Sequence, residues 1–198
     1  ELVLESLDLF SLWQKHVGQA FLVGALAYGL ALAPDIDLEI FCEHPTIEAG
    51  FDVLKSCALK SGCLSTRFRN EMAGIDQGYY WQVQYQQKLG LLWKIDMWSI
   101  SVNHPGPTSR DMIAPMQKAL NEESRKIILN LKHAIRNDPQ TQCPSIDLYQ
   151  AVLVDGVRTY SELKAWLFWH ISEKINDWRK WLIIPDGKFA IDQSNLDF

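Results

Sequence analysis

Apolar and polar residues alternate along several segments in the first half of the chain, a pattern typical of strands that bury one face. The alternating segments are 35–41, 64–72, 79–86 and 91–101, and the apolar stretch 20–23 predicts a further short buried strand. Short glycine-containing links at 73–78 and 88–90 predict that the last three segments form an antiparallel meander. In the first alternating segment, the face opposite the apolar one carries Asp35, Asp37 and Glu39.

Apolar residues that recur every three to four positions predict helices elsewhere in the chain. The predicted helices are 2–15, 46–60, 119–136, 146–154 and 159 to about 181, the last beginning with a capping box at 159–162. A cluster of prolines and glycine at 103–107 marks a domain boundary. We therefore predict an α+β fold in which a mixed sheet with flanking helices (1–104) is followed by a helical domain (105–198).

The composition is that of an ordinary globular protein, with 47% hydrophobic and 22% charged residues among 198. The four cysteines lack the spacing of a zinc site, which predicts free thiols in a reduced cytoplasm. The apolar run 20–33 is shorter than the roughly 20 residues that a membrane span needs, so we expect it to be core and expect no membrane contact. Residues 1–100 hold 7 basic and 12 acidic residues, so the net charge of −5 belongs to the first half and suggests a bound cation.

Asp35 and Asp37 are the residues that point most directly to a functional site. Alternate strand positions place both carboxylates on one face, with Cβ atoms about 6–7 Å apart. Two like charges at this spacing favour a bound cation, and Mg²⁺ prefers carboxylate oxygens. Gly24 lies upstream, where a tight turn would let backbone N–H groups approach phosphate. The alternative is that both acids are solvated residues at the strand surface.

The segment around these residues resembles the motif of the nucleotidyltransferase superfamily, which includes polymerase-beta-like enzymes and small-molecule adenylyltransferases. That motif reads Gly-Ser-x-Ala-x-Gly-x-Ala, then Asp-x-Asp on the next strand. The matching residues are Gly24, Ala27, Gly29, Ala31, Asp35 and Asp37. The resemblance covers about residues 18–101 and implies a third carboxylate on a later antiparallel strand, for which Asp96 is the candidate.

The resemblance also implies a mechanism. Asp35 and Asp37 would hold Mg²⁺ on a nucleoside triphosphate, and Asp96 would bind a second Mg²⁺ or take the proton of the acceptor. The acceptor would attack the α-phosphate in line, and pyrophosphate would leave. Gly24 and Ala25, in the turn before the carboxylates, would receive the phosphates.

Three residues depart from the family pattern. Ala25 replaces the usual Ser, Tyr28 stands where a basic or small polar residue is common, and Pro34 replaces a Ser that often precedes the first Asp. The loss of one hydrogen bond to a charged group costs about 1.5–3 kcal/mol, which weakens a phosphate site without abolishing it. A catalytically silent member of the superfamily, acting as a binding or regulatory module, is therefore the alternative function.

Other charged residues are candidates for substrate contacts. Arg67 and Arg69 share one face of a predicted strand and are candidates for contact with phosphate or acceptor, or simply form a solvated face. Lys118 and Arg125 are candidates for binding the triphosphate, as part of a stripe that continues to Lys132 and Arg136 if the helix is continuous. The alternative is a solvated helix face.

Three further residues or sets have open alternatives. Asp96 is either the third ligand or one side of an ion pair with Lys94, and Glu39 is either a replacement third ligand or, in preference, a solvated acid. The tryptophans at helical spacing near the end of the chain are expected to be core, with stacking on a base as the alternative. They are Trp166, Trp169, Trp178 and Trp181.

The preferred prediction is a cytoplasmic, Mg²⁺-dependent nucleotidyltransferase that moves an NMP group, AMP first, from an NTP to a small-molecule acceptor, with two Mg²⁺ ions. The acidic isoelectric point of about 5.5 leads us to expect no nucleic-acid partner, because such proteins normally present a net basic face. The oligomeric state does not follow from the sequence.

Overall fold

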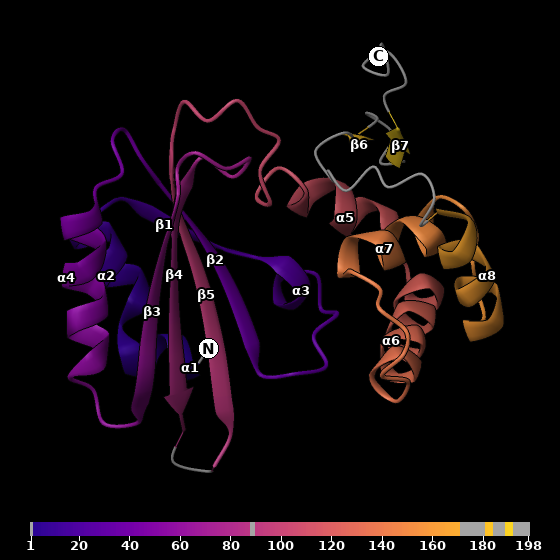
Figure 1. The fold of residues 1–198 in the computed structure, drawn as a ribbon, viewed down its shortest axis with the longest axis horizontal. Coiled ribbons are helices and arrows are strands. Elements are labelled where there is room, and N and C mark those ends of the chain that lie inside the picture. The colour runs from indigo at the N-terminus through magenta and orange to yellow at the C-terminus, as the bar shows by residue number, and fades with distance from the viewer. Residues whose placement is uncertain (1, 88–89, 171–180, 184–188, 192–198) are drawn as a thin grey trace. The chain divides into compact units, whose positions relative to one another are not determined.

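The computed structural model describes residues 2–87, 90–170, 181–183 and 189–191, and it divides the chain into two compact units, Glu1–Pro105 and Gly106–Phe198 (Figure 1). The first unit contains α1 (Leu2–Leu7), α2 (Leu9–His16), β1 (Gln19–Val23), α3 (Gly24–Ala27), β2 (Asp35–Cys42), α4 (Ile47–Ala58), β3 (Cys63–Glu71), β4 (Gly78–Gln86) and β5 (Leu92–Ser101). The second contains α5 (Ile113–Ala119), α6 (Glu122–Arg136), α7 (Ser145–Leu153), α8 (Tyr160–His170), β6 (Trp181–Ile183) and β7 (Phe189–Ile191). Each unit is described by itself.

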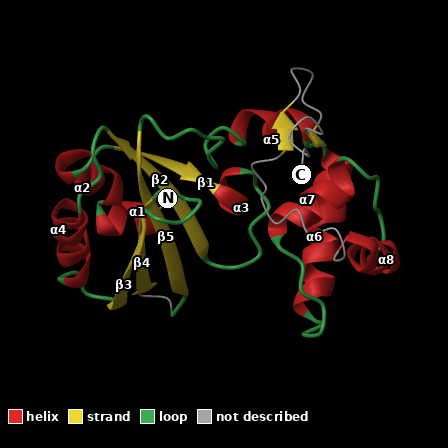
Figure 2. Cartoon of the chain, turned by 45° about the horizontal axis from the view of Figure 1, so that its top comes forward, coloured by secondary structure: helices red, strands yellow, loops and turns green. Residues whose placement is uncertain are grey.

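The five strands of the first unit form one mixed sheet in the order β1-β2-β5-β4-β3. Strands β3, β4 and β5 form the predicted antiparallel meander, and β1 is antiparallel to β2. Strand β5 inserts beside β2 and runs parallel to it. The resemblance implied that Asp96 lies on an antiparallel strand. Its strand, β5, is antiparallel to β4 but parallel to β2. The predicted α+β class with a mixed sheet and flanking helices is confirmed (Figure 2).

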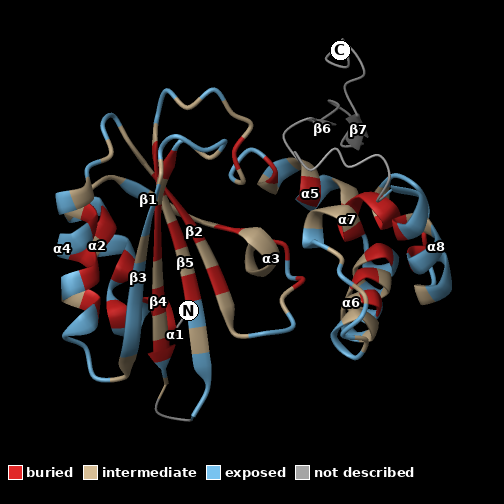
Figure 3. Cartoon of the chain, in the orientation of Figure 1, coloured by how far each residue is buried: buried red, intermediate tan, exposed pale blue. Residues whose placement is uncertain are grey.

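One face of the sheet is covered by helices and holds the hydrophobic core. Buried residues of α1, α2 and α4 pack on the apolar positions of β2, β4 and β5, among them Leu38, Trp81 and Met97. In Figure 3 the side of α4 that faces the sheet is buried and its outer side is exposed. The two fully buried tryptophans of this core satisfy their ring N–H groups, Trp13 on the sulfur of Met97 and Trp81 on Ser99. The predicted period-2 alternation therefore separates a core face from a polar face.

The opposite face of the sheet carries polar side chains in register across the strands. Residues paired on neighbouring strands point to the same face, so the pairings define rows. One row runs Arg67, Gln82, Asp96 and Asp37 across β3, β4, β5 and β2. The next row includes Lys94 opposite Asp35. The polar positions of four strands thus converge on the same surface.

The second unit is largely helical in its described residues, with β6 and β7 as a two-stranded sheet. Helix α6 begins with a capping box in which Asn121 and Ser124 exchange side-chain and backbone hydrogen bonds. The capping box predicted for α8 is confirmed, since Glu162 accepts from the Thr159 backbone N–H at 3.0 Å and its own N–H donates to the Thr159 hydroxyl at 3.3 Å. Local side-chain chemistry therefore sets both helix starts.

Three predicted helices have different bounds in the structure. The predicted helix 2–15 is two helices, because Asp8 adopts a left-handed conformation with φ of 54° that interrupts the helix. The predicted helix 119–136 is split between α5 and α6, because the Asn121 side chain caps the second helix. The last helix was predicted to reach about Trp181, but that residue begins β6, and 171–180 lie outside the described residues.

The prediction that the C-terminal tryptophans form core is wrong for Trp169, whose residue surface is 71% exposed. Helix α8 buries Leu163 and Leu167 instead. Trp166 is half-buried, donates to Asp155 at 2.9 Å and stacks on His170. Trp178 lies outside the described residues.

The structure bears on the predictions about a membrane span and about the cysteines. No helix in the described part of the chain combines the length and apolar character needed to cross a membrane. All four cysteines are free thiols. The predicted cytoplasmic location is not tested by either fact and stays a prediction.

Candidate metal centre

Three carboxylates converge on the polar face of the sheet. Asp35 and Asp37 come from alternate positions of β2, and Asp96 comes from β5. The parallel register places Asp96 directly opposite Asp37. One carboxylate oxygen from each residue lies within 4.8 Å of the other two. The structure therefore brings together the three acids that the sequence resemblance nominated.

The geometry of this cluster suits a small divalent cation. Oxygens on opposite sides of an octahedral Mg²⁺ ion are about 4.2 Å apart, since each Mg²⁺–oxygen bond is about 2.1 Å. Three ligands include at most one such opposite pair, and adjacent ligand oxygens lie about 3.0 Å apart, so the oxygens, which lie within 4.8 Å of one another, would draw closer together around an ion. The donor set is made of hard carboxylate oxygens, which Mg²⁺ prefers, and all three residues are partly exposed.

Gly24 lies against the carboxylate of Asp37, at the junction of β1 and α3. Its φ of +68° is in the left-handed region, and a Cβ atom there would overlap the Oδ2 atom of Asp37 and lie 2.8 Å from its Cγ. Only glycine allows the backbone to approach the carboxylate so closely. Ala25, the departure from the family motif, follows at once within α3, so the predicted phosphate turn does adjoin the candidate metal centre.

Asp96 is held in place by two side chains of β4. The hydroxyl of Tyr80 donates to Asp96 Oδ1 at 2.8 Å, and the amide of Gln82 donates to the same atom at 2.9 Å. Gln82 is the direct cross-strand partner of Asp96. Both residues were missed as site residues, although the alternation of β4 already placed them on its polar face. The missing information was the register between β4 and β5.

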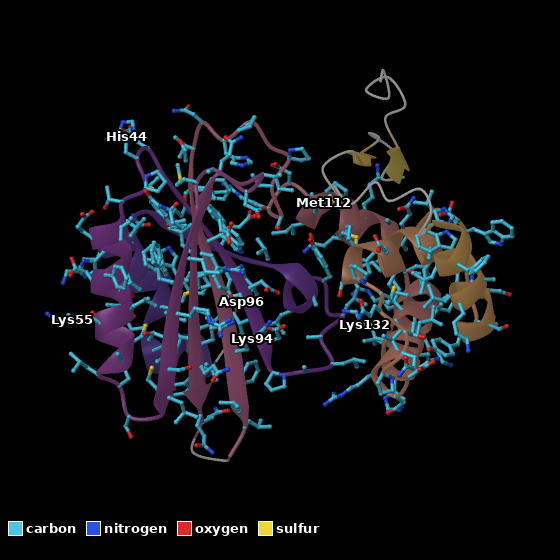
Figure 4. All side chains as sticks on the ribbon, in the orientation of Figure 1. His44, Lys55, Lys94, Asp96, Met112 and Lys132 are labelled. Carbon is cyan, nitrogen blue, oxygen red and sulfur yellow. The ribbon has the colours of Figure 1, made fainter. Side chains whose placement is uncertain are left out.

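Lys94 neutralises part of the cluster. Its ammonium lies 2.9 Å from Asp96 Oδ2 and 3.3 Å from Asp35 Oδ2. Figure 4 shows Lys94 and Asp96 next to each other on β5. Burial alone would lower the pKa of Lys94, but hydrogen bonds and charge from Asp96 and Asp35 outweigh it and raise that pKa, so the side chain is a cation at neutral pH. The ion pair that the sequence offered as an alternative for Asp96 is thus present beside the carboxylate cluster, and the two arrangements coexist.

Tyr80 is expected to remain protonated far above its ordinary range. Burial and the hydrogen bond to Asp96 raise the pKa of Tyr80 to about 12. Because the pKa is raised above the ordinary value of about 10, the stability it contributes is complete below pH 10 and is lost as the pH rises through about 12.

This expectation can be measured by ultraviolet titration of tyrosinate. The difference between the wild-type curve and that of Tyr80→Phe isolates this one residue, and we expect its midpoint near pH 12. If the tyrosinate signal that Tyr80→Phe lacks has its midpoint near pH 10, then neither burial nor the hydrogen bond to Asp96 raises the pKa of Tyr80. Circular dichroism at each pH tests whether both proteins stay folded during the titration.

The remaining acid of β2 behaves differently from its prediction. Glu39 was expected to be solvated, but it is only 7% exposed. It pairs with Trp98 in the register of β2 and β5, so a large aromatic residue stands beside it on the same face. Among the described residues, Glu39 is not part of the group that could hold a metal ion, and Asp96 takes the third position.

Arg67 and Arg69 lie on the polar face in β3, which β4 and β5 separate from β2. Arg67 shares the row of Asp96, and the Arg69 guanidinium lies 4.4 Å from the ring centre of Tyr80. Arg69 also forms an ion pair with Glu71 at 3.4 Å. Both arginines are exposed. Their contact with substrate stays a prediction. Both lie on the same sheet face as the carboxylate cluster, so a substrate bound at the cluster is the one that they would contact.

Lys118 and Arg125 belong to the second unit and to different helices. Lys118 is in α5, whereas Arg125 is in α6 together with Lys132 and Arg136, so the continuous stripe that the sequence suggested does not form. Lys132 donates to the hydroxyl of Tyr149 at 3.0 Å, within its own unit. The nucleotide-binding role of Lys118 and Arg125 stays a prediction.

No protein-family model and no curated protein matches the chain, whereas several solved structures do. CdnC from E. coli MS115-1 with ATP aligns with a TM-score of 0.55 and 11% identity over 100% of this chain and 70% of its own. Cid1 poly(U) polymerase bound to MgGTP aligns with a TM-score of 0.53 and 17% identity, over 96% of this chain and 73% of the Cid1 chain. A cytoplasmic RNA terminal U-transferase aligns with a TM-score of 0.53 and 14% identity over 75% of this chain, which spans only 43% of the length of that structure.

These similarities establish the fold, which is that of the polymerase-beta-like nucleotidyltransferases. They also overturn one prediction. The exclusion of a nucleic-acid partner is wrong, because two of the similar structures are named for a poly(U) polymerase and an RNA terminal U-transferase. The net charge of the whole chain misled because it ignores position: the only two arginines of the first unit both lie on the face that carries the candidate centre.

Proposed function

We propose that the chain transfers a nucleotidyl group from a nucleoside triphosphate to an acceptor hydroxyl, with Mg²⁺ held by Asp35, Asp37 and Asp96. The observation that carries this proposal is the convergence of the three carboxylates within 4.8 Å, beside Gly24, on the open face of the sheet. In the reaction, the acceptor oxygen forms a bond to the α-phosphorus as the bond to the pyrophosphate oxygen breaks, and the proton of the acceptor hydroxyl passes to water. Bound Mg²⁺ would supply charge neutralisation for the triphosphate and the departing pyrophosphate.

The roles of the residues follow from their surroundings. Asp37 lies against Gly24 and Asp35 shares its face of β2, so both are suited to hold the cation beside the turn where the triphosphate would enter. Asp96 already accepts hydrogen bonds from Tyr80 and Gln82, and its other oxygen faces Lys94. The two donors fix the orientation of the carboxylate through Oδ1, and Oδ2 already faces a cation, so we favour the role of metal ligand over that of proton acceptor. The proposal includes a second Mg²⁺ ion, and the number of bound ions is a quantity to measure.

The donor and the acceptor are the finer parts of the proposal. ATP is the first donor to test, because the motif around Gly24 and Asp35 resembles that of adenylyltransferases. We keep a small-molecule hydroxyl as one acceptor class. An RNA 3′ hydroxyl belongs in the same assay, since two of the similar structures are named for RNA-directed enzymes.

The second candidate function is a catalytically silent module that binds nucleotide. Two observations favour it: Ala25 offers no hydroxyl to phosphate, and the Lys94 ammonium already neutralises part of the carboxylate cluster. Such a module would keep the Asp35 and Asp37 site but would not turn over its nucleotide.

Thermal stability measured with Mg²⁺ and each of the four NTPs tests the proposal, together with an assay of pyrophosphate release. We expect at least one Mg²⁺–NTP pair to raise the melting temperature, and the double variant Asp35→Asn/Asp37→Asn to remove that rise. Pyrophosphate release with an acceptor would support the transferase. A thermal shift without release for either acceptor class would support the silent module, and no shift with any nucleotide would contradict both.

A further inference from the structure

Lys94 occupies an unusual position for a lysine beside a candidate metal centre. It precedes Asp96 by two residues on β5, so both side chains lie on the polar face. The parallel register also makes it the direct partner of Asp35. Its ammonium contacts both acids, at 2.9 Å and 3.3 Å from their Oδ2 atoms. One lysine therefore links the first and the third carboxylate of the cluster.

The oxygen of Asp96 that meets Lys94 is the one that the rest of the protein leaves available. Tyr80 and Gln82 both donate to Asp96 Oδ1, whereas Lys94 contacts Oδ2. On the other side, Lys94 contacts Oδ2 of Asp35. A cation that joins Asp35 to Asp96 would use the carboxylate edges at which the ammonium already sits.

A divalent ion and the ammonium cannot share these oxygens at their present distances. A Mg²⁺ ion bound about 2.1 Å from the same atoms would lie close to a like charge. Lys94 can leave without disturbing the fold, since its side chain is 45% exposed and its four-carbon stem is flexible. The charges are also suited to an exchange, because a divalent ion brings two positive charges to the three carboxylates where the ammonium brings one.

We infer that Lys94 is a tethered cation that competes with the divalent metal for Asp35 and Asp96, and so sets the metal affinity of the centre. In the metal-free protein it holds the carboxylates together against their repulsion. When metal binds, the ammonium moves away from the oxygens toward solvent. This inference rests on the proposed metal site, but not on turnover.

Calorimetric titration of the nucleotide-free protein with Mn²⁺ and with Mg²⁺ tests the inference. Lys94→Met removes the charge and keeps an unbranched apolar stem, Lys94→Arg keeps a cation, and Lys55→Met removes an exposed lysine from α4 as the matched control. We expect Lys94→Met to bind Mn²⁺ at least tenfold more tightly than wild type. Lys94→Arg and Lys55→Met should stay within about threefold of wild type.

Melting temperatures give a second readout that a purely structural lysine would not produce. Without metal, Lys94→Met should melt below wild type because the carboxylates repel each other, and Mg²⁺ should raise its melting temperature more than it raises that of wild type. If Lys94→Met does not fold without metal, Lys94→Gln replaces it in both experiments. An affinity of the folded variant equal to or weaker than that of wild type overturns the inference.

The outcome separates this inference from the proposed function. Wild-type turnover with an unchanged Mn²⁺ affinity in Lys94→Met would contradict the competition alone. Tighter metal binding in Lys94→Met without turnover in any protein would support the competition and contradict the transferase. Absence of Mn²⁺ binding to nucleotide-free wild type and variant alike would overturn the competition. The proposed function would then still be decided by the Mg²⁺–NTP thermal shift and pyrophosphate release, because the triphosphate itself supplies oxygen ligands to the metal.

Discussion

Replacing Asp37 with asparagine is expected to lower nucleotidyl transfer by about 10³-fold, because a metal ligand loses its charge at an almost unchanged shape. Charge stabilisation by a bound metal is worth several kcal/mol in the transition state, and about 4 kcal/mol corresponds to 10³-fold in rate. The residue lies at the centre of the cluster, opposite Asp96 and against Gly24. The rise in melting temperature that Mg²⁺–NTP produces should disappear together with the activity.

The measurement is release of pyrophosphate and transfer of label from an α-phosphate-labelled NTP, at saturating Mg²⁺. Asp52→Asn is the matched control, because Asp52 is an exposed aspartate on α4, which covers the other face of the sheet. Circular dichroism establishes that both variants are folded. Full activity in Asp37→Asn would show that this carboxylate does not hold the catalytic metal.

Replacing Gly24 with alanine is expected to impair both the stability of the first unit and the metal centre. The φ of +68° costs an alanine about 1–2 kcal/mol, which corresponds to a fall of roughly 4–16 °C in the melting temperature of a domain of this size. The new Cβ would also overlap Asp37 Oδ2, so the carboxylate must rotate away. A displacement of about 1 Å at a catalytic group costs about 10²-fold in rate, and we expect a loss of that order.

Gly90→Ala separates the two effects of this substitution. Gly90 has a φ of +85°, yet a Cβ there would meet nothing within 4 Å. The control should therefore lose stability through backbone strain but keep its thermal response to Mg²⁺–NTP and its transfer activity. If Gly24→Ala keeps the same metal response as Gly90→Ala, then the close approach of Gly24 to Asp37 has no role in the centre.

The secondary structure of the first unit followed closely from local patterns. Alternation predicted a strand at 35–41, and the structure has β2 at Asp35–Cys42 with its apolar side chains in the core. The helix boundaries were less predictable where one polar residue takes the backbone out of the helix. Asp8 does so through a left-handed conformation, and Asn121 does so by capping the next helix. Apolar periodicity does not record such single-residue effects.

The burial of individual acids was also beyond the sequence. Asp37 and Glu39 occupy equivalent alternate positions on β2, but only Glu39 is almost fully buried. The difference comes from neighbours on other strands, since Glu39 pairs with Trp98, whereas Asp37 pairs with Asp96. The solvent exposure of a strand position depends on these partners, and alternation alone does not name them.

By itself the sequence determined that Asp35 and Asp37 share one face and that a glycine turn precedes them, because both follow from geometry within a few residues. Only the tertiary structure decided that Asp96 lies opposite Asp37, that Lys94 lies opposite Asp35, and that Tyr80 and Gln82 hold Asp96. Strand order and register join β2 to β5 across about 60 residues of sequence, and they also align β4 with β5. They are set by the packing of the whole sheet against α1, α2 and α4, and a shift of one residue would have turned every one of these side chains to the other face.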